Sequence, residues 1–152
     1  MKSIVLYYSR SGTTEKLAKK IASALGSDIL KVELEKPYGN MLFSIIRYIK
    51  ERKKGIVPAV KTQLPSLDSY DTVLIGYPIW GNDVPSFLSD FVKKCSLKEK
   101  KVIPFATSGS SEMELTMKTV EAMCQESTIA HPFYYGLSKK DDFDKWLEAV
   151  RS

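Results

Sequence analysis

Uninterrupted apolar runs that alternate with amphipathic segments place the strongest constraint on how this chain can fold. The run from Ile4 to Tyr8 contains no charged or small polar residue, which is typical of a parallel strand covered by helices on both faces. After a short loop, a helix is predicted from apolar residues at helical spacing, which are Leu17, Ala18, Ile21, Ala22 and Leu25. Gly26 predicts where this helix ends. The first unit is therefore strand, tight loop and helix.

The same unit recurs along the chain. Further strands are predicted at residues 29–34, 72–77, 101–107 and 129–135. The helices between and after them are predicted from apolar residues on one face, which are Phe87, Leu88, Phe91 and Val92, then Met113, Met117, Val120 and Cys124, and finally Phe143, Trp146, Leu147 and Val150. Five strands alternating with helices imply the α/β class, with a doubly wound parallel sheet. At 152 residues, 43% of them hydrophobic, the chain is expected to form a single domain over residues 1–152.

Composition disfavours several classes of protein. Neither Cys95 nor Cys124 belongs to a Cys-x-x-Cys motif and His131 has no ligand partner nearby in sequence, so neither a metal site nor a disulfide is expected. The first apolar run is too short for a signal peptide and no run approaches ~18 residues, so we expect a cytoplasmic protein with no membrane partner. The net charge of +5 is concentrated at residues 47–54 and 93–101, neither within a nucleic-acid-binding module, so no nucleic acid is expected as a partner.

The segment between the second and third predicted strands contains a basic helix. Its predicted range is residues 41–53, and its apolar side is formed by Leu42, Ile45, Ile46 and Ile49. The favoured interpretation is a crossover helix that packs on the sheet through this apolar side, with Lys and Arg facing water. The alternative is a lid or docking surface beside the functional site, because residues 55–65 have no regular pattern.

Three loops are expected at the functional edge of such a sheet. In an open parallel α/β sheet, ligands bind beyond the carboxyl ends of the strands, where the strand order reverses. The loops that follow the first, third and fourth predicted strands span residues 9–14, 78–83 and 107–111. Candidate binding residues are therefore concentrated in these three segments.

The first of these loops is suited to a phosphate group. Its sequence is SRSGTT, with four hydroxyl residues and a glycine between a buried strand and a helix N-terminus. Unpaired backbone N–H groups and the positive end of the helix dipole favour an anion there. The loop lacks Gly-x-Gly-x-x-Gly, which disfavours an adenine dinucleotide, and it lacks Gly-Lys-Ser/Thr, which excludes a P-loop. Helix capping by the same hydroxyl groups is the alternative interpretation.

Three motifs in register resemble the flavodoxin family. The run IVLYYSRSGTTEKLAKKI, residues 4–21, is similar to the family segment that holds the phosphate of FMN. The segments GYPIWGNDVPSFLSDF, residues 76–91, and IPFATSGS, residues 103–110, resemble the loops that contact the flavin ring in short-chain members. The resemblance implies a five-stranded sheet of order 2-1-3-4-5 with helices on both faces, and FMN as the cofactor.

The resemblance also implies which residues bind the cofactor. The phosphate loop consists of Ser9, Arg10, Ser11, Gly12, Thr13 and Thr14. The ring-binding positions are Pro78, Ile79, Trp80, Gly81 and Asn82 in the second loop, and Thr107, Ser108, Gly109 and Ser110 in the third. Trp80 is expected to lie against the isoalloxazine, with core packing as the alternative. No catalytic side chain and no metal ligand are assigned.

Two departures from the family pattern bear on activity. The loop at residues 107–111 has no aromatic residue where electron-carrier flavodoxins place one, so one face of the flavin is expected to be open. The pI near 9.1 contrasts with the acidic character of those carriers. The preferred hypothesis is an oxidoreductase, resembling the tryptophan-repressor-binding and quinone-reductase proteins, that passes electrons from NAD(P)H through FMN to a quinone or other small acceptor. The alternatives are a non-enzymatic electron carrier between redox proteins and an interaction module that uses the basic helix, and a homodimer is left open.

Overall fold

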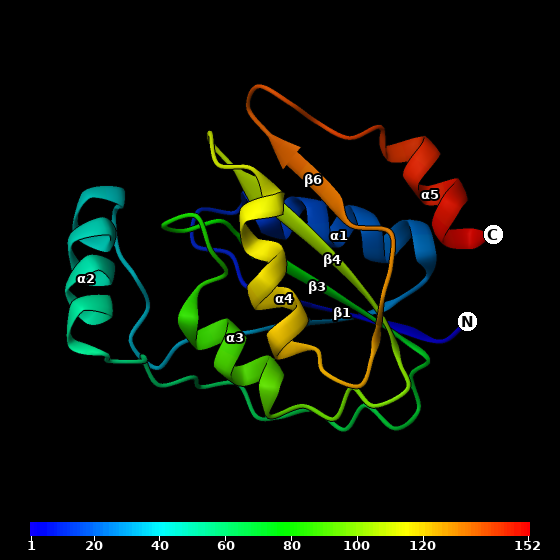
Figure 1. Ribbon diagram of the computed structural model, residues 1–152, viewed down its shortest axis with the longest axis horizontal. Helices are drawn as coiled ribbons and strands as arrows, with labels where there is room; N and C mark the ends of the chain where they lie inside the picture. Colours follow the sequence, from blue (N-terminus) through cyan, green and yellow to red (C-terminus); the bar gives the residue numbers. More distant parts are fainter.

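The computed structural model describes all residues, 1–152, and a parallel β-sheet lies at its centre (Figure 1). The strands are β1 (Ser3–Tyr7), β2 (Asp28–Lys31), β3 (Thr72–Pro78), β4 (Lys101–Ser108), β5 (Thr128–Ile129) and β6 (Phe133–Gly136). They lie in the order β2, β1, β3, β4, with β5 and β6 both paired to β4, and every pairing is parallel. The predicted doubly wound α/β class and the order 2-1-3-4-5 are confirmed.

Two strands differ in extent from their predictions. The single strand predicted at residues 129–135 is divided into β5 and β6, because His131 between them has a φ of 49° and Pro132 has no N–H to donate. Both short strands nevertheless occupy the same edge of β4. The strand predicted at residues 29–34 ends at Lys31, and Leu34 forms only an isolated antiparallel bridge with Val60.

Two helices cover each face of the sheet (Figure 1). The helices are α1 (Thr13–Leu25), α2 (Met41–Lys54), α3 (Ser86–Lys93), α4 (Met117–Met123) and α5 (Phe143–Arg151), and a single 3₁₀ turn, η1 (Met113–Thr116), precedes α4. One face is covered by α1 and α5 and the other by α3 and α4. None of these helices combines the length and the apolar character that crossing a membrane would require.

Burial on both faces explains the uninterrupted apolar runs. Val5, Leu74 and Ile103 belong to the core between the sheet and helices α1 and α5. Their strand neighbours Leu6 and Ile75 belong to the larger core on the α3 and α4 side. Because successive side chains of a strand point to opposite faces, both alternating sets must be apolar when both faces are covered.

A glycine in the central strand makes room for an aromatic side chain. Gly76 in β3 lies beside Phe105 of β4, and a Cβ at Gly76 would overlap the fully buried Phe105 ring. We therefore expect Gly76→Ala to lower the free energy of unfolding by ~1–3 kcal/mol, since the core has no space for the added methyl group. Urea unfolding checks this, with Gly39→Ala as the control, because a Cβ at Gly39 meets nothing within 4 Å. Equal stability of the two variants would contradict the overlap.

Helix α2 does not pack on the sheet, although the apolar spacing in its sequence favoured that interpretation. It stands apart from the sheet and its covering helices, on the side toward which the strands run (Figure 1). The apolar side predicted to be covered is exposed, with Leu42 at 65% and Ile46 at 54% of their full accessibility. Only Ser44 and Tyr48 of this helix are buried. The interpretation as a packed crossover helix is therefore wrong, because amphipathic spacing predicts a helix without specifying what covers its apolar side.

Candidate cofactor-binding site

The three predicted loops meet at the carboxyl ends of β1, β3 and β4. The Thr14 hydroxyl lies 2.8 Å from the Thr107 hydroxyl, which joins the first loop to the third inside the protein. The Ser111 hydroxyl donates to Asn82 Oδ1 at 2.9 Å, which joins the third loop to the second. The sheet order brings these contacts about, since β1, β3 and β4 are neighbours and run in the same direction. All three segments thus form one site.

The first loop presents backbone donors to an anion. Gly12 precedes α1 with a φ of 103°, and no side chain caps this end of the helix. The loop is held in shape by the Gly12 N–H, which donates to Ser9 Oγ at 3.0 Å. The first three helical N–H groups, those of Thr13, Thr14 and Glu15, have no acceptor within the protein. The alternative interpretation, that hydroxyl groups cap this helix, is therefore wrong. The three backbone N–H groups remain available to bind an anion.

The side chains of this loop fall into two groups. Ser11 and Thr13 are exposed at the helix end, where their hydroxyl groups can add to the backbone donors. Thr14 is buried, and its hydroxyl is engaged with Thr107. Arg10 is half-buried and its guanidinium donates to Gly39 O at 3.4 Å. The loop therefore offers backbone N–H groups, exposed hydroxyl groups and a nearby positive charge.

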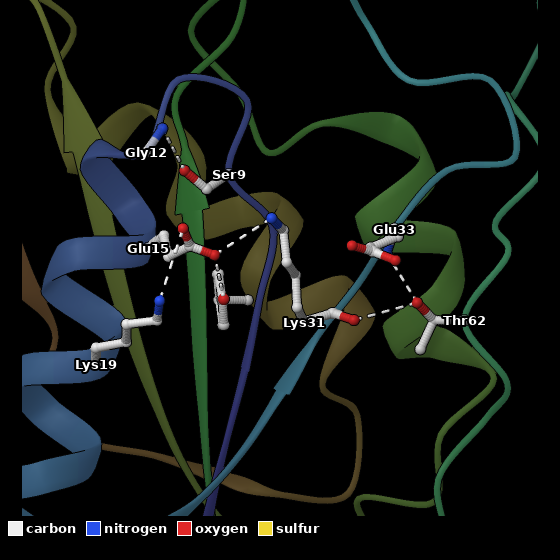
Figure 2. Close-up of polar contacts among 8 residues, drawn as sticks. Ser9, Gly12, Glu15, Lys19, Lys31, Glu33 and Thr62 are labelled. Atoms are coloured by element: carbon white, nitrogen blue, oxygen red, sulfur yellow. Dashed lines mark hydrogen bonds and ion pairs between the residues drawn. The ribbon is translucent and has the colours of Figure 1, made fainter.

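A carboxylate in the first turn of α1 is held by its own partners (Figure 2). Glu15 accepts a hydrogen bond from the Tyr7 hydroxyl at 2.7 Å and lies 3.2 Å from Lys31 Nζ. Lys19 is a more distant partner at 3.9 Å. The Tyr7 hydrogen bond, then Lys31, lowers the pKa of Glu15 below its ordinary value, so the group is charged at neutral pH. With its charge paired, Glu15 competes less with an anion for the helix end. This contact, which joins α1 to β1 and β2, was not predicted from the sequence.

The lowered pKa of Glu15 predicts a pH-dependent contribution to stability. A carboxyl whose pKa is lower in the folded state stabilises the fold above its unfolded pKa, near 4.5, and the contribution is lost as the pH falls through the folded pKa. We expect Glu15→Gln to lower Tm by ~2–4 °C at most at pH 7 and to match the unmodified chain at low pH. Thermal unfolding from pH 7 to pH 2 measures this, with exposed Glu121→Gln as the control. A difference that persists unchanged at pH 2 would contradict the prediction.

The second loop makes a tight turn that exposes its backbone. Trp80 and Asp83 exchange N–H to O bonds of 2.9 and 3.1 Å, and Gly81 and Asn82 between them have φ of 56° and 59°. Two successive positive φ angles are typical of a type I′ turn, which favours Asn and Gly. Arg52 of α2 donates to Gly81 O at 3.4 Å, so α2 also contacts this loop. Both turn residues are exposed, as backbone contacts to a ligand would require.

Trp80 lies at the centre of an aromatic cluster. Its ring centroid lies 5.6 Å from Tyr8, 5.1 Å from Tyr38, 5.0 Å from Tyr48 and 6.0 Å from Phe87, in edge-on arrangements. Trp80 is half-buried and packs against the larger core, so part of its surface is left for a ligand. The partner tyrosines were not predicted, because all three are more than 30 positions from Trp80 in the chain.

The third loop is short, polar and anchored from one side. Ser108 Oγ accepts from the Ser111 N–H at 2.9 Å, and the Tyr134 hydroxyl donates to Ser111 O at 2.5 Å. Gly109 and Ser110 at its tip are exposed. A Cβ at Gly109 would meet nothing within 4 Å, so the space beside this residue is open.

Comparison with known proteins identifies the family. A protein-family model described as Flavodoxin matches residues 2–150. The chain belongs to the flavodoxin family. A flavoprotein from Bacteroides uniformis is 27% identical, covers 99% of this chain and 98% of its own, and superposes with a TM-score of 0.82.

Two further structures share the flavodoxin fold of this chain. A flavoprotein from Lactobacillus acidophilus in complex with FMN is 20% identical, with a TM-score of 0.75 and coverage of 95% of this chain and 97% of its own. An NADH:FMN oxidoreductase is 18% identical, with a TM-score of 0.60 and coverage of 99% and 87%. At these identities the likeness is one of fold.

Proposed function

We propose that this protein is an FMN-dependent oxidoreductase that passes electrons from NAD(P)H to a quinone or other small acceptor in the cytoplasm, acting as a single domain over residues 1–152. The cofactor prediction is confirmed, because the chain belongs to the flavodoxin family and a structure of the same fold is a complex with FMN. The proposal extends from the cofactor to the enzyme activity. The NADH:FMN oxidoreductase of the same fold supports this extension.

The residues of the site fit the parts of FMN. The free N–H groups of Thr13, Thr14 and Glu15, with the exposed hydroxyl groups of the first loop, suit its phosphate. Residues 78–82 and 107–110 would hold the ring, with Trp80 along one side and the exposed backbone of the two loops at its polar edge. When bound, FMN supplies the hydride and electron chemistry, while the protein contributes binding, orientation and electrostatics.

The main support for the enzyme proposal is that the third loop has no aromatic residue to cover the flavin ring. No aromatic side chain stands at residues 107–110, and the tip of this loop is exposed. A nicotinamide or a quinone must approach the flavin ring closely to exchange a hydride or electrons, so an uncovered face favours small-molecule substrates. A carrier needs only an exposed ring edge that a partner protein can reach.

Steady-state assays with FMN-loaded protein test the proposal. We expect oxidation of NADH or NADPH with a panel of quinones at turnover numbers within the ~1–1000 s⁻¹ range common for enzymes. Gly109→Trp should lower turnover while FMN stays bound, because the new side chain has space and would cover the substrate face. If electrons enter only when a reductase protein is added, the protein is an electron carrier and the enzyme proposal fails.

A further inference from the structure

The outer face of α2 is a continuous apolar surface with no partner in the chain. We call it the α2 apolar face, and it consists of Met41, Leu42, Phe43, Ile45, Ile46 and Ile49. Each of these side chains is at least half exposed, and Met41 and Phe43 reach 66%. Single exposed apolar residues are ordinary, whereas a contiguous group of six on one helix marks an interaction site.

The opposite face of α2 makes contacts with the rest of the protein. Ser44, Tyr48 and Arg52 recur every four residues and point to the rest of the protein. Ser44 donates to Gly39 O at 3.1 Å, Tyr48 lies 5.0 Å from Trp80, and Arg52 donates to Gly81 O. Because these contacts hold one face inward, rotation of the helix to bury the α2 apolar face would break them.

The charges of α2 are almost all positive and mostly unpaired. Glu51 is the only acidic residue between Lys36 and Lys54, and it is engaged by Arg47 at 3.2 Å and by the Tyr38 hydroxyl. The remaining cations, Lys50, Arg52, Lys53 and Lys54, are exposed and have no carboxylate partner. A partner that offers both an apolar surface and negative charge would therefore complement this helix.

The apolar and basic parts of this surface adjoin. A hollow of about 360 Å³ is lined by the side chains Ile46, Ile49, Lys50, Lys53 and Lys54. On a helical projection, Arg52 and Lys50 lie just inside the two edges of the α2 apolar face, and Lys53 lies within it, toward the carboxyl end of the helix. Long lysine side chains at a membrane surface can reach the headgroups while neighbouring apolar side chains enter the acyl boundary.

We propose that the α2 apolar face docks this protein reversibly on the surface of an anionic phospholipid bilayer. The apolar side chains would enter the outer part of the bilayer, and Lys50, Lys53 and Lys54 would contact phosphate groups. This replaces the sequence-based expectation that no membrane is a partner, while the chain still lies on the membrane rather than across it. Because Arg52 joins α2 to Gly81, the docked bilayer would lie beside the second loop of the cofactor site.

A second copy of this chain fits the same face less well. Two copies would bring together surfaces that carry unpaired cations and no unpaired anion. An anionic bilayer satisfies both the apolar and the charged requirement.

Vesicle flotation with the 152-residue chain tests the proposal. We expect binding to vesicles of phosphatidylglycerol mixed with phosphatidylcholine, no binding to phosphatidylcholine alone, and weaker binding as salt rises above 0.1 M, where the Debye length is ~10 Å. The triple variant Lys50→Glu, Lys53→Glu, Lys54→Glu should lose more than about a hundredfold in affinity, since each cation near an anionic surface contributes about fivefold. The variant Leu42→Ser, Phe43→Ser, Ile46→Ser should lose binding as well.

Matched controls separate this face from general properties of the protein. The variant Lys101→Glu, Lys118→Glu, Lys139→Glu makes the same change in net charge at exposed sites elsewhere, and Leu115→Ser with Leu137→Ser removes exposed apolar residues elsewhere. Both should bind vesicles nearly as the unmodified chain does, and circular dichroism should show that all variants fold. Absence of vesicle binding at low salt would overturn the proposal. A dimer in light scattering that only the Leu42, Phe43, Ile46 variant dissociates would also overturn it, because a second copy would then cover the face.

Discussion

Riboflavin is expected to bind this protein more than about a thousandfold more weakly than FMN. The two flavins share the ring and the sugar chain and differ in the phosphate group. In the structure, the N–H groups of Thr13, Thr14 and Glu15 have no acceptor within the protein, and they lie at the positive end of α1. A hydrogen bond to a charged group contributes ~1.5–3 kcal/mol, so even the lower value for three bonds exceeds 4 kcal/mol, or about a thousandfold in affinity.

Fluorescence titration of the apoprotein with both flavins measures this difference. Ser9→Ala should weaken FMN by up to about tenfold and leave riboflavin unchanged, because Ser9 Oγ accepts the Gly12 N–H and thereby shapes the phosphate loop. Ser23→Ala, at an exposed position of the same helix, is the matched control and should affect neither ligand. Equal affinities for FMN and riboflavin would show that the loop does not bind the phosphate.

The positions of the loops could be predicted from the sequence because they depend on local periodicity and on one topological rule. The apolar run at Ile4 and the helical spacing after Gly12 fix a strand and a helix, and the hydroxyl-rich turn must lie between them. The parallel order then places this turn beside the loops that follow β3 and β4. That the helix end lacks a side-chain cap could not be predicted, since Thr14 turns instead to Thr107, 93 positions further along the chain.

The environment of α2 could not be predicted for a different reason. Leu42, Ile45, Ile46 and Ile49 have the spacing of a helix that packs on a sheet, and periodicity does not distinguish such a helix from one that serves an outside partner. What decides the outcome is the inner row of this helix, in which Tyr48 and Arg52 contact the distant second loop. Tyr48 contacts Trp80 across 32 positions of sequence, and that contact directs the apolar side outward.

The division of the last predicted strand into β5 and β6 could be predicted only in part. The sequence contains the signal, since Pro132 stands inside the predicted strand and cannot donate to the ladder. What the sequence does not show is that His131 adopts a positive φ, which interrupts the strand before the proline. The Trp146 indole N–H donates to His131 O at 2.7 Å, so α5 supports this bend.

Trp80→Ala is expected to change both the stability of the apoprotein and its affinity for FMN. The ring of Trp80 contacts four aromatic rings and is half-buried, so its loss should cost somewhat less than the ~3–5 kcal/mol of a fully buried Trp→Ala change. The exposed part of the ring is proposed to lie along the isoalloxazine, and its loss should weaken FMN by ~0.5–1.5 kcal/mol, or up to about tenfold.

Two measurements on the same protein separate these roles. Urea unfolding of the apoprotein reports the packing of the aromatic cluster, and flavin fluorescence reports the contact with the ring, which an adjacent indole should quench. Trp80→Phe is the matched control, because a smaller aromatic ring keeps part of the cluster, and it should retain most of the stability while quenching less. A large loss of stability in Trp80→Ala with unchanged FMN affinity and unchanged quenching would mean that Trp80 serves only the core. In that case the wall of the flavin site would have to come from the backbone of Gly81 and Asn82, whose exposed turn is the nearest remaining part of the second loop.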